Sequence, residues 1–434
     1  MLNAKKIIME GTHPSTGCTE PVAVAWACAL AAQAVGGKVE EVFVSVDANV
    51  YKNAIAVGIP SSGGRYGLEV AAGLGSLGDP TRMFQILEKV SENSRKEMLK
   101  LIDSKKIKIH LNEDAKELRI EAKIKTEKGT GCSLIEKYHT NLTELKVNDQ
   151  KIAFPHYCCS DKCSSSKKES LVGSVTVKEL IRLADEIDEE LEQWLWKGIE
   201  MNMEIARQGL EENFGLCVGK KIQQLVKQGL LGDDSANYAS YMTASAVDAR
   251  MSGANFPVMT NAGSGNQGLG TIVPVMSFAA FHKITDSQKI LKAIAVAHLI
   301  SIYVKEHTGV LSYLCGCAHG ATAGAAAGVL TLAGYDAHTI EKAMQNITAD
   351  VTGMICDGGK PGCALKLALS AGEAVRIALL ATIGLEAQAR DGIVGASAED
   401  SFANIAQISQ KCAKTADQTI VHILDELHKK KHCE

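Results

Sequence analysis

The sequence predicts an α+β fold, in which a mostly helical C-terminal domain is joined to a small inserted α/β domain. Two observations support it. Apolar and polar residues alternate, as in strands, in several stretches between 38 and 156. Nearly every stretch after 175 instead repeats its apolar residues at helical spacing. We therefore expect an N-terminal helix within 1–37 that packs on the C-terminal domain, an α/β domain at 38–165 and an all-helical domain at 170–434.

The first helix is entered through the residues GCTEP. Pro21 suits a first helical position, and Thr19 or Glu20 can cap the helix. The glycine pair at 36–37 ends it.

The α/β domain begins where the spacing of apolar residues changes from helical to alternating. Residues 38–60 alternate in polarity and predict a strand hairpin, and the glycine-rich stretch SSGGRYG follows as a turn. Helical stretches continue to about 103, and strand-like runs such as KIKIHLNE and ELRIEAKIKTE come next. The polar stretch at 158–173 predicts a linker, in which Cys158, Cys159 and Cys163 are interpreted as incidental surface thiols.

The composition excludes several classes of function. A net charge of −4 gives no basic surface for nucleic acid or an anionic membrane. The longest apolar run, 21–35, is shorter than the ~20 residues that cross a bilayer, and the polar residues before it make a poor signal peptide. The 13 cysteines show no regular spacing, which favours free thiols in a reducing cytoplasm over a disulfide framework.

Two cysteine pairs lie on glycine-rich turns that precede helical runs. Cys315 and Cys317 stand in LCGCAHGATAGAAAG, and Cys356 and Cys363 stand in GMICDGGKPGCALK. Thiolates placed in this way suit a tetrahedral zinc or an iron–sulfur cluster. Inert core thiols and a redox pair are the alternatives.

A second glycine-rich segment, GSGNQGLG at 263–270, contains the spacing G-x-G-x-x-G. Because no clear strand precedes it, dinucleotide binding is disfavoured. Its backbone N–H groups, with Ser264, Asn266 and Gln267, predict instead an anion-binding nest for a substrate carboxylate or phosphate. A plain tight loop is the alternative.

Several single residues could also take part in catalysis or binding. Cys18 precedes a helix N-terminus, where the helix dipole lowers a thiol pKa, so it is a candidate nucleophile, base or ligand, or else a structural thiol. Lys360 is a candidate partner of a substrate carboxylate or of Asp357. Asp248 and Arg250 are interpreted as a structural ion pair, and the histidines at 13 and 319 as structural residues that could alternatively act as bases.

Four motifs in order resemble the bacterial and archaeal L-cysteine desulfidases, relatives of the iron–sulfur L-serine dehydratase alpha chain. They are GCTEP, SAVDARMSGANFPVMTNAGSGNQG, GCAHGATAGAAAG and GMICDGGKPGCALK. The resemblance implies a [4Fe–4S] cluster held by Cys317, Cys356 and Cys363 with one iron open, although Cys315 could take the place of Cys317. It also implies that Cys18 accepts a proton and that the loop at 261–268 binds a carboxylate.

The activity implied is the conversion of L-cysteine and water to pyruvate, ammonia and hydrogen sulfide, with the open iron acting as a Lewis acid on the β-substituent. A soft iron–thiolate interaction favours cysteine over serine. The alternatives are an L-serine ammonia-lyase with the same cluster, an iron–sulfur protein that binds cysteine or sulfide without turnover, and a zinc-stabilised scaffold. The expected partner is a small amino acid, with no nucleic acid and no membrane, and a homo-oligomer is possible.

Overall fold

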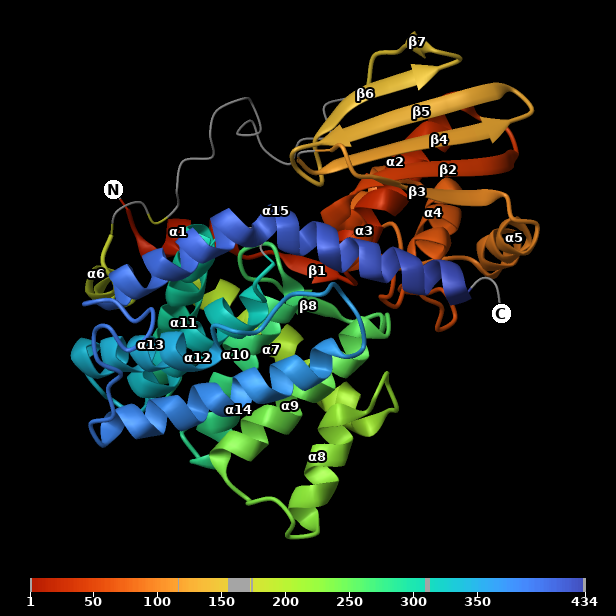
Figure 1. Ribbon diagram of the computed structural model, residues 1–434. Helices are drawn as coiled ribbons and strands as arrows, with labels where there is room; N and C mark the ends of the chain where they lie inside the picture. Colours follow the sequence, from red (N-terminus) through yellow and green to blue (C-terminus); the bar gives the residue numbers. More distant parts are fainter. Residues whose placement is uncertain (1, 116, 155–171, 173–174, 309–312, 432–434) are drawn as a thin grey trace.

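The computed structural model describes residues 2–115, 117–154, 172, 175–308 and 313–431, without the side chains of 429–431. The predicted linker at 158–173, with its three cysteines, lies outside this set except for residue 172. The α+β fold is confirmed: a sheet with its covering helices stands beside a larger helical region (Figure 1).

The sheet has six strands in the order β3-β2-β4-β5-β6-β7. They are β2 (Val39–Asp47), β3 (Ile107–Asn112), β4 (Arg119–Thr126), β5 (Gly129–Glu136), β6 (Leu142–Val147) and β7 (Gln150–Lys151). The β2–β3 pair is parallel and the other pairs are antiparallel. Alternate residues such as Val44, Val46 and Ile120 are fully buried, because one face of the sheet is covered by helices.

The stretch after β2 is helical and not the second strand of a hairpin, so that prediction was wrong. Asp47 ends the strand and caps α3 (Ala48–Ala54), since its Oδ1 accepts hydrogen bonds of 2.8 Å from Asn49 N and 3.2 Å from Val50 N. This cap satisfies two of the free N–H groups at the helix start and outweighs the alternation in polarity.

The helix that begins after Cys18 is α2 (Thr19–Val35), and it packs mainly on the sheet and on α4 (Leu68–Ser76). The expectation that it packs on the helical domain is therefore corrected. Its side chains are apolar all round, so both sides are buried. Trp26 and Leu30 belong to the sheet core, while Val22 and its neighbours reach a cluster shared with α9 (Ser235–Met251).

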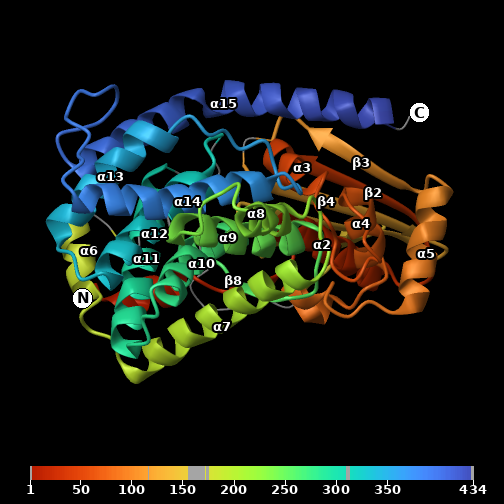
Figure 2. The same cartoon turned by 90° about the horizontal axis from the view of Figure 1, so that it is seen from below.

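The helical region is built from long, small-residue helices that lie close together (Figure 2). They are α6 (Val177–Leu183), α7 (Glu189–Glu211), α8 (Val218–Lys227), α9, α10 (Gly265–Phe281), α11 (Ser287–Thr308), α12 (Gly316–Leu332), α13 (Ala337–Val351) and α14 (Cys363–Thr382). A Cβ on Gly324 of α12 would lie 2.4 Å from the carbonyl oxygen of Ala297 on α11. The glycine therefore allows the two backbones to approach.

The N-terminal segment joins this region. Helix α1 (Ala4–Gly11) packs on α11, and β1 (Pro14–Thr16) pairs antiparallel with β8 (Pro257–Met259), just before α10. This pairing brings the residues that lead to Cys18 beside the loop that leads to α10.

One helix of the described residues, α11, is long and apolar enough to cross a bilayer. Of its most apolar window, 78% is buried inside the protein, and the helix is surrounded by α1, α7, α10 and α12. This burial is typical of a core helix.

The last helix, α15 (Ala398–Lys431), lies across both parts of the molecule (Figures 1 and 2). At one end it packs on α11 and α13, and further along it contacts α3. There Asp417 accepts a 2.6 Å hydrogen bond from the buried Lys52, and Asp425 accepts one of 3.0 Å from the Tyr51 hydroxyl.

Candidate functional site

A cavity of about 140 Å³ lies where the sheet part meets the helical region. The sheet part contributes Cys18, Glu20, Lys52 and Asn53 on and around α2 and α3, and the β5–β6 loop adds His139. The helical region contributes the first turn of α10, the first turn of α12 and the segment that leads into α14. Helices α9 and α11 each add one cation. The lining residues of the helical region are Arg250, Ser264, Gly265, Asn266, Gln267, Lys305, Cys315, Cys317, Cys356, Cys363 and Lys366, with several glycines.

The two cysteine-bearing turns are held together by backbone pairing. Cys315 N donates a 2.9 Å hydrogen bond to the carbonyl of Met354, and Cys356 N donates one of 2.6 Å to the carbonyl of Tyr313. Cys315 is the N-cap of α12, and Cys363 begins α14. Local strand pairing and two helix starts thus bring four thiols to one cavity.

The four thiols differ in acidity. A hydrogen bond from the Cys315 thiol lowers the pKa of Cys317, and the Ser264 hydroxyl, 3.6 Å from the Cys317 sulfur, contributes in the same direction. The same bond and burial raise the pKa of Cys315. Burial raises the pKa of Cys356, and that of Cys363 to about 11. Cys317 is therefore the thiol whose surroundings most favour the thiolate, which is the form that binds a metal.

Buried lysines surround these thiols. Burial lowers the pKa of Lys305, and the nearby cysteines act in the opposite direction; among the described residues no carboxylate is paired with it. Lys52 and Lys366 also line the cavity, and each has an aspartate partner outside the lining set. Cations in this arrangement offset the negative charge that thiolates and a bound anion would bring.

Four cysteine thiols line the cavity, and cysteine thiolates are the residues that hold iron–sulfur clusters. Among the described residues, no three His, Cys, Asp or Glu side chains form a group that could hold a single metal ion. The thiols of Cys317, Cys356 and Cys363 are therefore the side chains of the cavity whose chemistry fits a cluster.

Cys18 contacts a carboxylate. Its sulfur donates to Glu20 Oε2 at 3.3 Å, and Glu20 Oε1 accepts a 2.9 Å hydrogen bond from Asn53 Nδ2. Burial, followed by the charge of Glu20, raises the pKa of Cys18 well above its ordinary value. The argument that the helix end favours the thiolate is therefore wrong for this structure: burial and the Glu20 carboxylate favour the protonated thiol.

Arg250 does not pair with Asp248, so that interpretation was wrong. Residues two apart on a helix point to different faces. Asp248 instead accepts a 3.1 Å hydrogen bond from Gly219 N at the start of α8. Arg250 faces the cavity, where it donates 2.9 Å to Asn266 Oδ1 and 2.7 Å to the carbonyl of Gly17. Among the described residues no carboxylate pairs with this buried guanidinium.

The space for Arg250 exists because residue 265 is glycine. A Cβ there would lie 2.4 Å from Arg250 Nε and 2.5 Å from its Cζ. The guanidinium thus lies against the first turn of α10, where the N–H groups of Gly265 and Asn266 have no acceptor among the described residues. A cation and free N–H groups converge at one end of the cavity.

The predicted nest residues have different surroundings. Ser264 caps α10 and touches Cys317. Asn266 holds Arg250, whereas the Gln267 amide is fully buried and donates to Asn261 Oδ1 and to Ser301. Ser264 and the backbone of the turn are therefore placed to meet a ligand, and Gln267 fixes the loop beneath them.

Lys360 is the predicted site residue that the structure does not bring to the cavity wall. It pairs with Asp357, and its Nζ lies 3.4 Å from the carbonyl oxygen of Gly358. Burial alone would raise the pKa of Asp357, but hydrogen bonds from Lys360 and Lys366 outweigh it and lower that pKa to about 2. Lys366, one turn into α14, lines the cavity in place of Lys360.

Sequence reasoning missed four lining residues: Glu20 as the partner of Cys18, Lys52, Lys305 and His139. His139 Nε2 is buried without a hydrogen-bond partner among the described residues, and burial lowers its pKa. Of the histidines considered from sequence, His13 is exposed and His319 is buried outside the lining set, with its pKa lowered to about 4 by burial. For Lys305, the sequence did offer a signal of a functional role: it is a single lysine within an apolar helical run.

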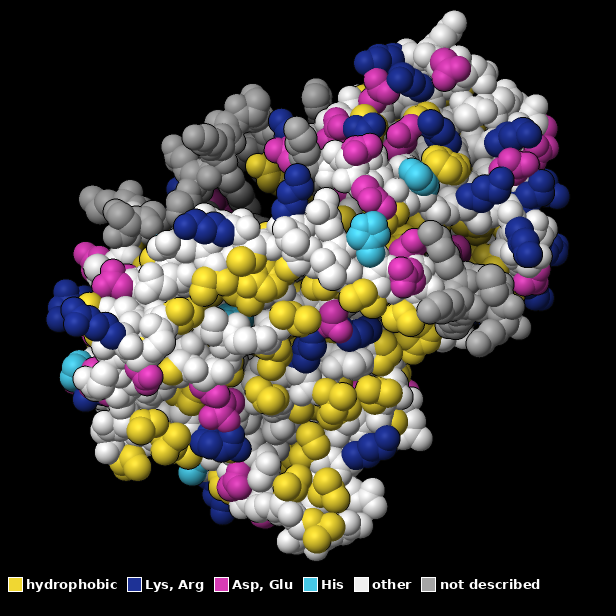
Figure 3. Space-filling model, in the orientation of Figure 1, with side chains coloured by type: hydrophobic (Ala, Val, Ile, Leu, Met, Phe, Trp, Pro, Cys, Tyr) yellow, Lys and Arg dark blue, Asp and Glu magenta, His cyan; other side chains and the backbone are white. Residues whose placement is uncertain are grey.

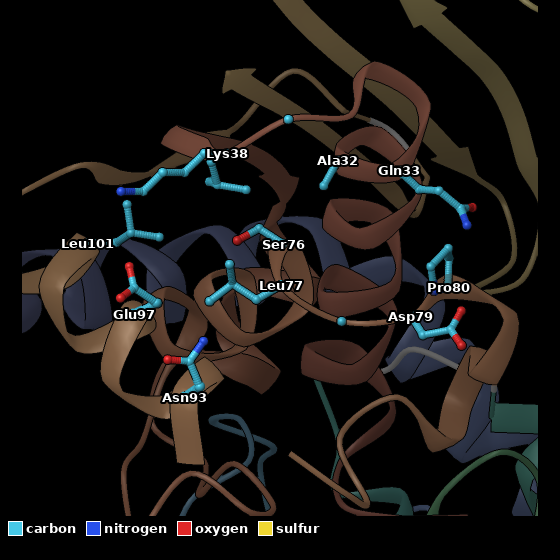
Figure 4. A pocket seen from close by; sticks show the side chains of 13 residues that line it. Ala32, Gln33, Lys38, Ser76, Leu77, Asp79, Pro80, Asn93, Glu97 and Leu101 are labelled. Carbon is cyan, nitrogen blue, oxygen red and sulfur yellow. The ribbon is translucent and has the colours of Figure 1, made fainter. Parts of the chain in front are cut away.

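A larger hollow of about 580 Å³ lies elsewhere, between α2, α4 and α5 (Glu92–Asp103) (Figure 4). Its wall contains Lys38, Asp79 and Glu97 among small and apolar residues, and none of the cysteines. The chemistry-bearing residues therefore gather at the smaller cavity.

Comparison with known proteins agrees with this arrangement. The family model described as serine dehydratase alpha chain matches residues 81–422. The chain belongs to the serine dehydratase alpha chain family. This match includes all four cavity cysteines of the helical region and Arg250, while Cys18, Glu20 and Lys52 precede it.

Relatives of the family extend over the whole chain. A UPF0597 protein of Desulfotalea psychrophila is 38% identical, with 99% of each chain covered. UPF0597 proteins of Clostridioides difficile and Geobacter sulfurreducens are 37% and 36% identical, with 96% of this chain and 97% of each relative covered. These names state no substrate, so family membership supports a lyase function related to serine dehydration and leaves the substrate open.

Proposed function

We propose that this chain is an iron–sulfur-dependent L-cysteine desulfidase, which converts L-cysteine and water to pyruvate, ammonia and hydrogen sulfide. The observation that carries the proposal is that Cys18, Arg250 and four thiols line one cavity. An elimination of this kind needs a base, a carboxylate-binding group and an acceptor for the leaving group, and these residues can supply all three.

Cys317, Cys356 and Cys363 would hold a [4Fe–4S] cluster, with Cys315 donating its hydrogen bond to the Cys317 sulfur. When bound, the cluster supplies a Lewis acid for the β-substituent of the substrate. Lys52 and Lys305 would offset the charge of the thiolates.

The substrate carboxylate would bind at Arg250 and the first N–H groups of α10. A buried guanidinium without a carboxylate partner among the described residues can bind a carboxylate in bidentate geometry. The helix N-terminus adds favourable potential for an anion. Neutralising the carboxylate makes the adjacent α-proton more acidic, because charge then develops less unfavourably on the α-carbon.

The proton would be moved by Cys18 and Glu20. Glu20 takes the proton of the Cys18 thiol, along the 3.3 Å contact between them, and the Cys18 sulfur then takes the α-proton. Asn53 keeps the Glu20 carboxylate oriented toward Cys18. The electron pair of the broken C–H bond forms the double bond to the β-carbon as the β-substituent leaves. The aminoacrylate that results tautomerises to an imine, and water hydrolyses this imine to pyruvate and ammonia.

L-Serine is the second candidate substrate, and the description of the matching family favours it. The residues that bind the carboxylate and move the proton would be the same, with water as the leaving group. The soft sulfur of cysteine is the better match to iron, which places cysteine first.

The test is anaerobic reconstitution of the full chain with iron and sulfide, followed by pyruvate and sulfide assays on L-cysteine and L-serine. Equal release of sulfide and pyruvate from cysteine is expected, with activity reduced by at least about 100-fold in Cys18→Ala. Cys132→Ala is the matched control, because this half-buried thiol on β5 lies outside the cavity.

The other outcomes are equally informative. Pyruvate from serine alone would assign the serine lyase. A reconstituted cluster without turnover of either amino acid would contradict catalysis and favour a binding protein, and failure of the chain to retain iron would overturn the cluster itself.

A further inference from the structure

Helix α14 carries an exposed apolar stripe along its outer side. Leu365 and Leu369 are 57% and 53% exposed, Leu379 is 44% exposed and Ile383, at the C-cap, is 81% exposed. These positions are four, ten and four residues apart, and ten residues are the sum of two three-residue steps and one four-residue step, so the four side chains share one face of the helix. Figure 3 shows hydrophobic side chains gathered over α14 and over the neighbouring α8.

A face of this kind is unusual for a monomer. Single exposed leucines are common, but four large apolar side chains exposed on one face of one helix mark an interaction surface. The opposite side of α14, which includes Leu367, Ala371 and Val375, is already buried against the rest of the helical region. The outer stripe therefore has no partner within the described residues.

The order of residues along the stripe is symmetric. Leu365 and Ile383 lie equally far from Ala374 in opposite directions, and so do Leu369 and Leu379. Glu373 and Arg376 occupy the middle of the same face, where they form an ion pair. When the helix is laid antiparallel on a copy of itself about this midpoint, apolar residues meet apolar ones and each Glu373 faces an Arg376 of the other copy.

We propose that this face, defined by Leu365, Leu369, Glu373, Arg376, Leu379 and Ile383, is the interface of a twofold symmetric dimer of this chain. Twofold dimers use one self-complementary surface in both subunits, and this stripe is self-complementary in both polarity and charge. Stable interfaces bury roughly 1,200–2,000 Å². The exposed Leu225 and Leu230, on α8 and just after it, extend the apolar surface beside α14.

The dimer would lie close to the cavity. Leu365 is two residues after Cys363, and Ile355, which is 46% exposed, precedes Cys356. Association would cover the outer side of the segments that carry these two thiols without using the thiols themselves.

Charge variants of the full chain test the interface. Arg376→Glu places two carboxylates at the midpoint of each copy, and Glu373→Arg places two cations there. Because like charges would then meet across the twofold axis, each variant alone should dissociate, with a dissociation constant raised at least about tenfold. An equimolar mixture of the two variants should restore a dimer, since opposite charges meet. Arg207→Glu is the matched control, because Arg207 pairs with Glu204 at the same spacing on α7.

The measurement is sedimentation velocity of the reduced protein at micromolar concentrations, with circular dichroism to confirm folding. The expected native result is the mass of two chains. A native monomer at these concentrations would overturn the proposal. So would variants that remain as dimeric as the native protein, or a mixture of the two that fails to associate.

Discussion

Leu314 and Ile355 form an isolated antiparallel β-bridge that connects the two cysteine-bearing turns. The bridge joins residues on either side of α12 and α13, so main-chain hydrogen bonds hold the segments that carry Cys315 and Cys356. Such bonds persist when a side chain is changed. Cysteine substitutions at this site are therefore expected to remove a ligand without unfolding the turns.

Cys317→Ser should lose nearly all bound iron after anaerobic reconstitution, whereas Cys315→Ser should retain most of it. Cys317 is the thiol that its neighbours favour as a thiolate, and Cys315 contributes only a hydrogen bond to it. Iron content and visible absorption measure the difference. Equal iron loss in both variants would mean that the two thiols share the ligand role.

Gly265→Ala should weaken substrate binding more than it slows turnover. The new Cβ would meet the Arg250 guanidinium at 2.4–2.7 Å and displace it from the first turn of α10. KM for the amino acid should rise about tenfold or more, which corresponds to about 1.4 kcal/mol. Gly353→Ala is the control, because nothing lies within 4 Å of a Cβ at that position. An unchanged KM would remove Arg250 from the binding site.

Asp248→Asn should change how stability depends on pH. Burial raises the pKa of Asp248 from 3.8 to about 6, so ionising it in the folded protein is unfavourable. The native protein should therefore lose stability relative to the variant as pH rises from about 4 to 6, by at most about 3 kcal/mol. The asparagine can still accept the hydrogen bond from Gly219 N.

Thermal unfolding of the metal-free proteins between pH 4 and 7 measures this change. Asp336→Asn serves as the control, because hydrogen bonds from Thr339 lower the pKa of the exposed Asp336 below its usual value. This carboxylate is mostly ionised in the folded and unfolded chain throughout the measured range, so the stability difference for Asp336→Asn should stay nearly constant. A stability difference between Asp248→Asn and the native protein that is constant across this range would show that Asp248 titrates normally.

Asp417→Asn should destabilise the fold by about 3 kcal/mol or more, since it leaves the charge of Lys52 buried without its partner. Lys52 is only 2% exposed, so water cannot replace the lost carboxylate. The double variant Lys52→Met with Asp417→Asn should recover much of this loss, because no buried charge remains. Calorimetric unfolding temperatures of the three proteins test this order, and a double variant no more stable than Asp417→Asn would contradict it.

Much of the fold followed from periodicity, but the placement of α2 did not. Its surface is apolar all round, which predicts that the helix is buried but not which elements bury it. In the structure, Trp26 and its neighbours pack against the inner face of the sheet. Likewise, the alternation after Asp47 was overridden by one capping carboxylate. The first miss concerns a choice between tertiary partners that a single sequence does not encode locally, whereas the second concerns a local helix cap that the alternation in polarity obscured.

The cavity thiols were predictable because each lies on a glycine-rich turn before a helix. Arg250 and His139 were not, since their approach to the site depends on contacts between distant segments. Asp248 and Arg250 in the small-residue run TASAVDARMSGA were interpreted as an ion pair, because their nearness in sequence suggested that they are partners. The need for glycine at residue 265 follows only from the packing of α10 against α9, which brings Arg250 close to it.

The bond between Lys52 and Asp417 also orders events during synthesis. The two residues are 365 positions apart, so at ribosomal rates of ~5–20 residues per second Lys52 emerges on the order of 20 to 70 seconds before its partner. Through this interval the nascent sheet part carries an uncompensated ammonium group at the future cavity. The Lys52 ammonium group thus gains its carboxylate partner only when α15 docks, so the charge balance beside the cavity is completed late in the biogenesis of the protein.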